Sequence, residues 1–430
     1  MKYSPAALLQ LLRTPLGRHQ IAYGLRFRAW PIYAAAARVH RGRLDGRARF
    51  VAIVGSFGKT TTTRAVLAAL GRDPHSQVGG NSWSFVAQRV LAARAGEHTV
   101  IEVGISGPGQ MARYASLVRP DITVVTSIGS EHNRSLGTLE RTRDEKAAMV
   151  RALPPDGVAL LNGDDPNVLW MRTQTRARVL TYGFGADNDI RGGNVRLDWP
   201  HGMRLDVTVA GATREVRSVL IGRTMAYPLL AGVAVGHTEG RDPDEVARAL
   251  AVVEPPPGRL ERIALANGVW LLRDEYKSAL ETVHAALDVV EQIPARRKIV
   301  VLGEIAEPFG SQGPIYRDLG ARLAGIATCV IVVGSHHQPI AAGAARAGLA
   351  RTAVLDAGRS VARTSELLGA MLEPGDVVLL KGRDTQKLDR IYLALTGQQV
   401  GCDLVTCDAK LRCARCPMLA RGWQGRPVVM

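Results

Sequence analysis

A glycine loop stands between an apolar run and a helical segment near the start of the chain. The sequence Gly55-Ser56-Phe57-Gly58-Lys59-Thr60 directly follows the apolar residues 50–54. A loop in this position directs backbone N–H groups and a helix N-terminus at one point, which makes an anion site. The familiar phosphate loop has two more residues between its glycines, so a structural turn is the competing interpretation. Only eight lysines occur in the chain, and lysine at this position therefore favours phosphate binding.

Short apolar runs alternate with helical patterns from residue 50 onward. This alternation predicts an α/β fold with a mostly parallel sheet covered on both faces. A polar, alternating section at residues 191–220 predicts antiparallel strands, and the α/β pattern restarts after a proline cluster at residues 255–257. The predicted strands are residues 50–54, 99–103, 122–126 and 158–161 before the cluster, and residues 269–272, 299–302, 330–333 and 377–380 after it.

Four segments are predicted from these patterns. Residues 1–48 form a basic amphipathic helical leader, and residues 49–257 form a phosphate-loop domain with a mostly parallel sheet. Residues 258–396 form a second, Rossmann-like α/β domain, with Pro255-Pro256-Pro257-Gly258 as the linker. Residues 397–430 form a tail that holds four of the five cysteines. A chain of 430 residues with 46% hydrophobic content is long enough for such domains.

About half of the net charge of +16 lies in residues 1–48, where nine Lys or Arg residues face one acid, Asp45. Apolar residues at helical spacing accompany this charge, which predicts one or two basic amphipathic helices. The longest apolar run is too short for a membrane span. We therefore predict a cytoplasmic protein whose basic leader rests on the inner membrane face or on a protein partner; a helical hairpin packed on the core is equally compatible. Aromatic residues are only 5%, which argues against nucleic acid.

Three polar residues follow the predicted strands in order. Glu102 ends the second strand, His132 follows the third, and Lys146 lies in the next helical segment. The carboxyl ends of neighbouring parallel strands meet at one edge of a sheet, so all three side chains could approach the phosphates. Taken singly, each residue would be better explained by a structural role: Glu102 as a surface acid, His132 as a helix cap and Lys146 as a solvated helix lysine.

In this order and spacing, the set resembles the Mur ligase family of ATP-dependent amide-forming enzymes, whose phosphate loop has the same short form. The resemblance covers about residues 49–395. Four further stretches resemble the branch that adds D-alanyl-D-alanine to the peptidoglycan precursor: GRLE at residues 258–261, DEY at 274–276, VLGEIAE at 301–307 and LLKGRD at 379–384.

The resemblance implies a role for each matching residue. The catalytic residues would be Lys59, Lys146 and His132. Nucleotide would be bound by Gly55, Ser56, Gly58, Lys59, Thr60, Thr61, Asn162, Arg259 and Asp274. Magnesium ions would be held by Thr60, Glu102, His132 and Lys146, with the lysine carried as a carbamate. Substrate would contact Tyr276, Lys381 and Arg383.

The resemblance further implies a reaction in which ATP and Mg²⁺ convert a carboxylate into an acyl phosphate, and an amine then displaces phosphate. The substrates would be small carboxylates and amines. The leader is shorter than the substrate-binding domain of the peptidoglycan ligases, which favours another acceptor. Peptidoglycan-precursor ligation, amidation with a partner glutaminase, and a non-catalytic nucleotide-gated binding module are the alternatives.

Besides its short leader, the chain departs from the family pattern at three places. Glu131 stands where the family usually has Asp before the histidine, which is a mild change. The family has residues that bind the adenine at positions where this chain has Thr224, Met225 and Pro228. Lys277-Ser278-Ala279-Leu280 follows Tyr276, where the D-alanyl-D-alanine branch has Asn and Pro. Nucleobase preference and amine specificity are therefore expected to differ.

The tail cysteines Cys402, Cys407, Cys413 and Cys416 fall within 15 residues. Cysteines so crowded in a reducing compartment are typical of metal ligands rather than disulfides. Zn²⁺ held by four thiolates is the leading prediction, with an iron–sulfur cluster or unliganded thiols as alternatives. Cys329 lies in a predicted strand and is predicted to belong to the core.

Overall fold

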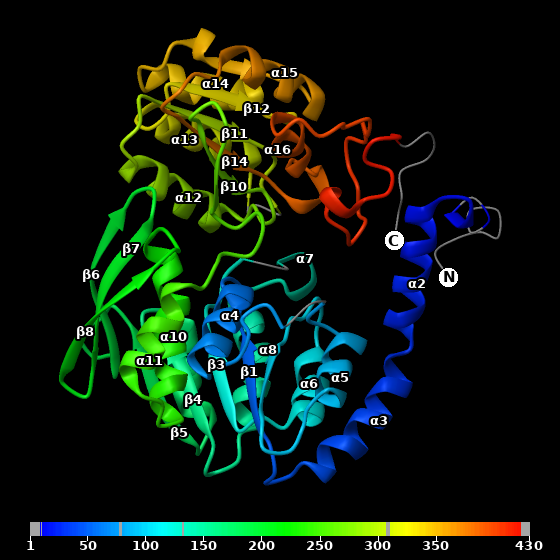
Figure 1. Ribbon diagram of the computed structural model, residues 1–430, viewed down its shortest axis with the longest axis vertical. Helices are drawn as coiled ribbons and strands as arrows, with labels where there is room; N and C mark the ends of the chain where they lie inside the picture. Colours follow the sequence, from blue (N-terminus) through cyan, green and yellow to red (C-terminus); the bar gives the residue numbers. More distant parts are fainter. Residues whose placement is uncertain (1–8, 10, 77–79, 131–132, 307–309, 423–430) are drawn as a thin grey trace. The chain divides into compact units, whose positions relative to one another are not determined.

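The computed structural model describes residues 9, 11–76, 80–130, 133–306 and 310–422. The chain divides into two compact units (Figure 1). The central unit comprises residues 26–254, and the C-terminal unit comprises residues 1–25 together with residues 255–430. The two α/β units and their mostly parallel sheets confirm the predicted fold class.

The central unit is built on an eight-stranded sheet in the order β2-β1-β3-β4-β5-β6-β7-β8. The first six strands in this order pair in parallel, and β6, β7 and β8 pair antiparallel, as the polar section predicted. The strands are β1 (Arg49–Val54), β2 (His98–Glu102), β3 (Ile122–Val125), β4 (Val158–Asn162), β5 (Arg178–Gly183), β6 (Ile190–Asp198), β7 (Gly202–Val209) and β8 (Ala212–Ser218).

Helices cover both faces of this sheet. The side chains of strand β1 are buried on both faces. Phe50, Ala52 and Val54 belong to one apolar core, and Val51 and Ile53 belong to the other. A strand buried on both faces reads as a continuous apolar run. The helices are α3 (Trp30–Arg43), α4 (Lys59–Ala69), α5 (Ser84–Leu91), α6 (Gln110–Val118), α7 (Asn133–Leu136), α8 (Leu139–Arg151), α9 (Pro166–Leu169), η1 (Trp170–Gln174), α10 (Arg223–Thr238) and α11 (Pro243–Ala251).

The C-terminal unit holds a six-stranded sheet in the order β13-β12-β11-β14-β10-β9, in which only the edge strand β9 is antiparallel to its neighbour. Its strands are β9 (Glu261–Ala264), β10 (Trp270–Asp274), β11 (Arg297–Leu302), β12 (Cys329–Val332), β13 (Val354–Asp356) and β14 (Asp376–Lys381). Its helices are α12 (Leu280–Gln292), α13 (Gln312–Ala324), α14 (His337–Arg346), η2 (Arg351–Ala353), α15 (Val361–Met371), η3 (Asp384–Gln386), α16 (Asp389–Leu395) and η4 (Cys413–Arg415).

The described part of the basic leader is mostly helical, as predicted. Helix α2 (Pro15–Arg28) begins in the C-terminal unit and ends in the central unit, and α3 packs on the central unit through Ala34, Ala37 and Arg41. The buried Arg41 donates from Nε to the carbonyl of Val118 at 2.9 Å. Across the described ranges, no helix is both long and apolar enough to cross a bilayer.

An ion-pair cluster ties helix α10 to the start of the sheet. The carboxylate of Glu239 accepts from His98 Nε2 at 2.6 Å and from Arg49 Nη2 at 2.7 Å. These hydrogen bonds lower the pKa of Glu239 from 4.5 to about 2. Because the folded pKa is depressed, the stabilisation is complete above the unfolded pKa and disappears as the pH falls from about 4.5 to about 2.

Glu239→Gln is therefore expected to lower the free energy of unfolding of the central unit at pH 7 by about 1–3 kcal/mol. The variant should also lose less stability than the wild type between pH 5 and pH 2. Thermal melts of both proteins across this range measure the effect. Identical pH dependence of the two proteins would contradict the assignment.

Candidate active site

The predicted phosphate loop connects β1 to α4 and depends on its two glycines. Gly55 has a φ of 144° and Gly58 a φ of 79°, both in the region that favours glycine. A Cβ on Gly55 would lie 2.0 Å from Thr126 Oγ1, so no side chain fits there. Gly58 precedes α4 and provides no side-chain cap. A helix N-terminus at this position directs backbone N–H groups toward an anion such as phosphate.

Ser56 anchors this loop to the neighbouring strand and to helix α8. Its backbone N–H donates to Ser127 O at 2.7 Å, and its hydroxyl oxygen accepts from Gly129 N at 2.9 Å. The same hydroxyl lies 2.9 Å from Lys146 Nζ, 90 residues further along the chain. The structure therefore brings the buried side chain of Lys146 directly against the phosphate loop.

Lys59 begins α4 and is folded over the loop. Its Nζ donates to the carbonyls of Gly55 at 2.8 Å and Ser56 at 2.9 Å. Thr60 is partly exposed at the start of the helix, whereas Thr61 is buried. The cationic side chain of Lys59 is therefore held where a phosphate group on this loop would lie.

Glu102 and Asn162 end strands on either side of the loop. Glu102 pairs in register with Ile53, one residue before the end of β1, and accepts from Asn81 Nδ2 at 2.7 Å. Asn162 is buried at the end of β4 and donates to the carbonyl of Thr126 at 2.8 Å. Both residues thus lie at the carboxyl edge of the sheet with the loop. Glu131 and His132 lie outside the described residues.

The residues predicted after the proline cluster lie in the C-terminal unit. Asp274 ends β10 and Lys381 ends β14, and the two are paired in register. Lys381 Nζ donates to Asp274 Oδ2 at 2.5 Å and to Lys277 O at 2.8 Å, while Asp274 Oδ1 accepts from Leu260 N at 3.1 Å. Burial lowers the pKa of the Lys381 ammonium, and the neighbouring Asp274 opposes this effect. In this arrangement Lys381 faces Asp274 inside the unit, where it can orient the carboxylate.

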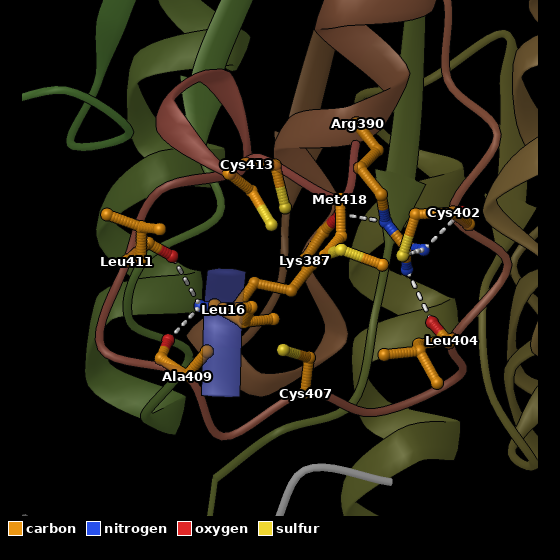
Figure 2. A pocket seen from close by; sticks show the side chains of 11 residues that line it. Leu16, Lys387, Arg390, Cys402, Leu404, Cys407, Ala409, Leu411, Cys413 and Met418 are labelled. Atoms are coloured by element: carbon orange, nitrogen blue, oxygen red, sulfur yellow. Dashed lines mark hydrogen bonds between the residues drawn. The ribbon is translucent and has the colours of Figure 1, made fainter. Parts of the chain in front are cut away.

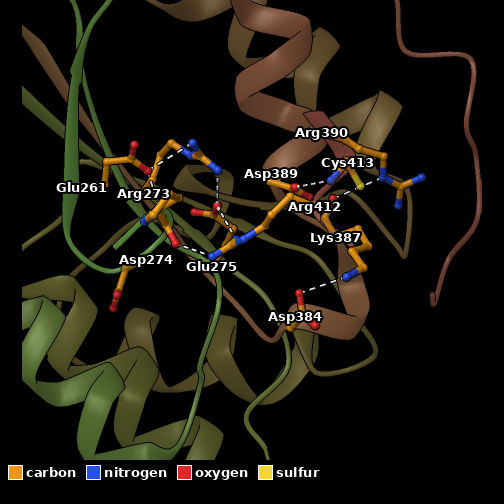
Figure 3. Close-up of polar contacts among 12 residues, drawn as sticks. Glu261, Arg273, Asp274, Glu275, Asp384, Lys387, Asp389, Arg390, Arg412 and Cys413 are labelled. Atoms are coloured by element: carbon orange, nitrogen blue, oxygen red, sulfur yellow. Dashed lines mark hydrogen bonds and ion pairs between the residues drawn. The ribbon is translucent and has the colours of Figure 1, made fainter. Parts of the chain in front are cut away.

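Two arginines lie over the ring of Tyr276. Arg259 lies over the ring with its Cζ 4.8 Å from the centroid, and Arg412, from the cysteine-rich tail, lies at 4.4 Å. Arg412 Nη1 is also 3.8 Å from the buried carboxylate of Glu275. Desolvation raises the pKa of Glu275 to about 7, and the facing Arg273 partly offsets this shift. Figure 3 shows Arg273, Glu275 and Arg412 close together. Arg383, the third predicted substrate residue, precedes η3.

The four tail cysteines lie around one small cavity in the C-terminal unit (Figure 2). All five cysteines of the chain are free thiols. Among the described residues, no three His, Cys, Asp or Glu side chains are disposed as an assembled metal site. Cys329 begins β12 and is partly buried, and burial raises the pKa of its thiol.

Sequence reasoning missed several residues of these sites. Arg412 contacts Tyr276 across 136 positions of sequence, and the buried Lys387 and Arg390 lie against the cysteines. Asn81, which donates to Glu102 from 21 positions earlier in the chain, was also missed. No local sequence pattern marks Arg412, because its contacts with Tyr276 and Glu275 depend on how the tail folds against β10.

Comparison with known proteins agrees with this geometry. Residues 53–236 match the Mur ligase middle domain, and residues 258–383 match the Mur ligase glutamate ligase domain. The UDP-N-acetylmuramoyl-tripeptide--D-alanyl-D-alanine ligase of Mycobacterium tuberculosis (strain H37Rv) is 30% identical over 391 residues, covering 84% of this chain and 75% of the relative. The ligase of that name from Escherichia coli is 27% identical, covering 81% of this chain and 77% of the relative.

The fold is similar to that of solved ligases. MurF of Thermotoga maritima in complex with ADP superimposes with a TM-score of 0.72 at 21% identity, covering 86% of this chain and 83% of that one. Folylpolyglutamate synthase of Mycobacterium tuberculosis gives a TM-score of 0.63 at 17% identity, covering 86% and 95%. The two matched domains and the extent of the sequence relationship establish that this chain belongs to the Mur ligase family of ATP-dependent amide-forming ligases.

Proposed function

We propose that this enzyme activates a peptide carboxylate with ATP and joins an amino acid or a short peptide to it. The observation that carries the proposal is the 2.9 Å contact between Lys146 and Ser56. A purely nucleotide-gated module needs a phosphate loop but has no use for a buried lysine from a distant helix at that loop. The lysine is useful where a group must be transferred from the bound nucleotide.

The reaction has two steps that balance without a further reactant. A carboxylate oxygen attacks the γ-phosphorus of ATP, the bond to the β-phosphate oxygen breaks, and ADP leaves. The amine nitrogen then attacks the acyl carbon, the carbon–oxygen bond to phosphate breaks, and the nitrogen loses a proton. Lys59 and the amides at the start of α4 would stabilise the negative charge of the transferring group.

The donors at the sheet edge fit magnesium. Thr60 supplies a partly exposed hydroxyl, and Glu102 supplies a carboxylate at the end of the strand beside β1. Hard oxygen donors of this kind are the ligands that Mg²⁺ prefers. Bound there, Mg²⁺ would offset phosphate charge and orient the γ-phosphate.

We propose that Lys146 works as a carbamate. Its amine nitrogen would add to CO₂ and release one proton, which replaces a cation by a carboxylate-like anion. Burial of the side chain at 2% exposure makes a retained ammonium costly beside bound magnesium. An anion in the same place would be a further oxygen ligand.

D-alanyl-D-alanine is the first amine to consider, because several relatives carry it in their names. Lys277, Ser278 and Ala279 follow Tyr276 directly and lie beside the Asp274–Lys381 pair, since Lys381 donates to Lys277 O. We propose that this turn selects the amine, with Tyr276 and Arg383 contacting substrate and Asp274 accepting from nucleotide hydroxyls. The acceptor would be a peptide carboxylate such as a UDP-muramyl peptide.

Phosphate release from Mg²⁺-ATP tests the proposal. The enzyme is incubated with D-alanyl-D-alanine, pooled amino acids or ammonia, each crossed with UDP-muramyl peptides or other pooled carboxylates. We expect release that requires both an amine and a carboxylate, and that decreases about 10²–10³-fold in Lys59→Ala. Release with ammonia alone as the amine would point to amidation. ATP binding without release in every combination would contradict ligase activity.

A further inference from the structure

The tail cysteines converge although they are separated by four, five and two residues. Cys402, Cys407, Cys413 and Cys416 all line one cavity of about 20 Å³ (Figure 2). A cavity of this size accommodates a single particle the size of a water molecule. It therefore suits an ion and excludes an organic ligand.

Two buried cations of the C-terminal unit hold the cysteine segment in place. Arg390 donates to the carbonyls of Cys402 and Leu404, both at 2.6 Å. Lys387 Nζ donates to Ala409 O at 3.0 Å and to Leu411 O at 3.4 Å. These hydrogen bonds thus fix the backbone between the cysteines, which has little regular secondary structure.

The same arginine is directed at sulfur. Arg390 Nη1 lies 3.5 Å from Cys402 Sγ, and Arg390 is only 1% exposed. Carbonyl dipoles alone compensate a buried guanidinium poorly, whereas an anionic sulfur would supply a counter-charge. Hydrogen bonds from neighbouring cations to ligand sulfurs are a common feature of thiolate metal sites.

The last two cysteines form a tight turn. Cys416 N donates to Cys413 O at 2.9 Å across η4, and Asp389 Oδ2 accepts from Cys413 N at 3.0 Å. A pair spaced C-x₂-C on such a turn is typical of zinc sites. Two ligands are therefore presented from one short segment that helix α16 holds in position.

Apolar side chains cover part of the cavity. Leu11 and Leu16 from the N-terminal segment pack with Ala409, and Leu16 itself lines the cavity. Ala409 and Leu16 are each 2% exposed. Cys413 is buried, whereas Cys402, Cys407 and Cys416 are partly exposed.

We propose that the four cysteines bind one zinc ion and that this metal centre fastens the N-terminal segment to the C-terminal unit. Binding would bring the four sulfurs together by side-chain rotation and release one proton from each thiol. The product is a tetrahedral four-thiolate centre, closed to further ligands and hence structural.

Metal analysis of the full chain, purified without chelator, tests the proposal. We expect about one zinc per chain in the wild type and in Cys329→Ser, the control cysteine outside the cavity. Cys402→Ser and Cys413→Ser should each retain less than about a tenth of this zinc. Should a variant fail to fold, titration of wild-type thiols with a mercurial gives the same information, because zinc should be released in step with four thiols.

Cobalt substitution identifies the ligands. Co²⁺ added to metal-stripped wild type should give the intense sulfur-to-cobalt absorption and the visible bands of a tetrahedral four-thiolate site. Folded wild-type protein that contains no zinc and takes up no Co²⁺ would overturn the proposal. Iron with sulfide, or two disulfides found by mass spectrometry, would overturn it as well.

Discussion

Replacing Lys146 by alanine should lower turnover about 10²–10³-fold while the central unit keeps its fold. Lys146 Nζ donates to Ser56 Oγ, so the variant loses this hydrogen bond between helix α8 and the phosphate loop. Steady-state phosphate release measures the loss. Arg151→Ala is the matched control, because Arg151 lies on the same helix and forms an exposed ion pair with Asp144.

The sign of the charge at position 146 distinguishes a carbamate from an ammonium ion. Lys146→Glu should retain more activity than Lys146→Arg if the working group is an anion that binds magnesium. The opposite order would show that a cation is required there. Carbon-13 NMR under labelled CO₂ gives an independent measurement, because a carbamate signal should be present in the wild type and absent in Lys146→Ala.

The second large effect is expected on stability. Lys381→Met should destabilise the C-terminal unit by about 3–5 kcal/mol, because it leaves the carboxylate of Asp274 buried without its cation. The two side chains lie 2.5 Å apart at the ends of adjacent parallel strands. Urea unfolding, followed by hydrogen exchange on β10 and β14, measures this change.

Two further variants define the origin of that effect. Lys381→Met combined with Asp274→Leu should recover much of the stability, since an apolar pair of similar volume avoids the buried charge. Lys298→Met is the control, because Lys298 lies on the adjacent strand β11 and donates to Glu291 O at an exposed position. A single Lys381→Met variant as stable as this control would contradict the buried ion pair.

Much of the fold was predictable because parallel strands buried on both faces leave a continuous apolar signal. Strands β1, β3, β4 and β11 were predicted to within one or two residues. Strands β5, β9 and β13 were missed. Strand β5 begins with a charged residue, β9 is a charged edge strand, and β13 has three residues, so their pairing depends on neighbours rather than on local sequence.

The candidate site likewise has a part that was predictable from the sequence and a part that was not. The glycine loop was predictable because Gly55 and Gly58 meet local backbone requirements. The pairing of Asp274 with Lys381 was not, because strand order in a parallel sheet is set by long-range packing; β10 and β14 are neighbours although about a hundred residues separate them. The predicted nucleotide role of Asp274 and substrate role of Lys381 remain predictions.

The C-terminal unit is made of two stretches of the chain that are not adjacent in sequence. Residues 1–25 belong with residues 255–430, and Leu11 and Leu16 complete the apolar cluster around Ala409. A fragment that starts at the proline cluster would therefore expose the cysteine cavity, and a cleavage after Glu254 would leave the unit with a non-covalently held piece.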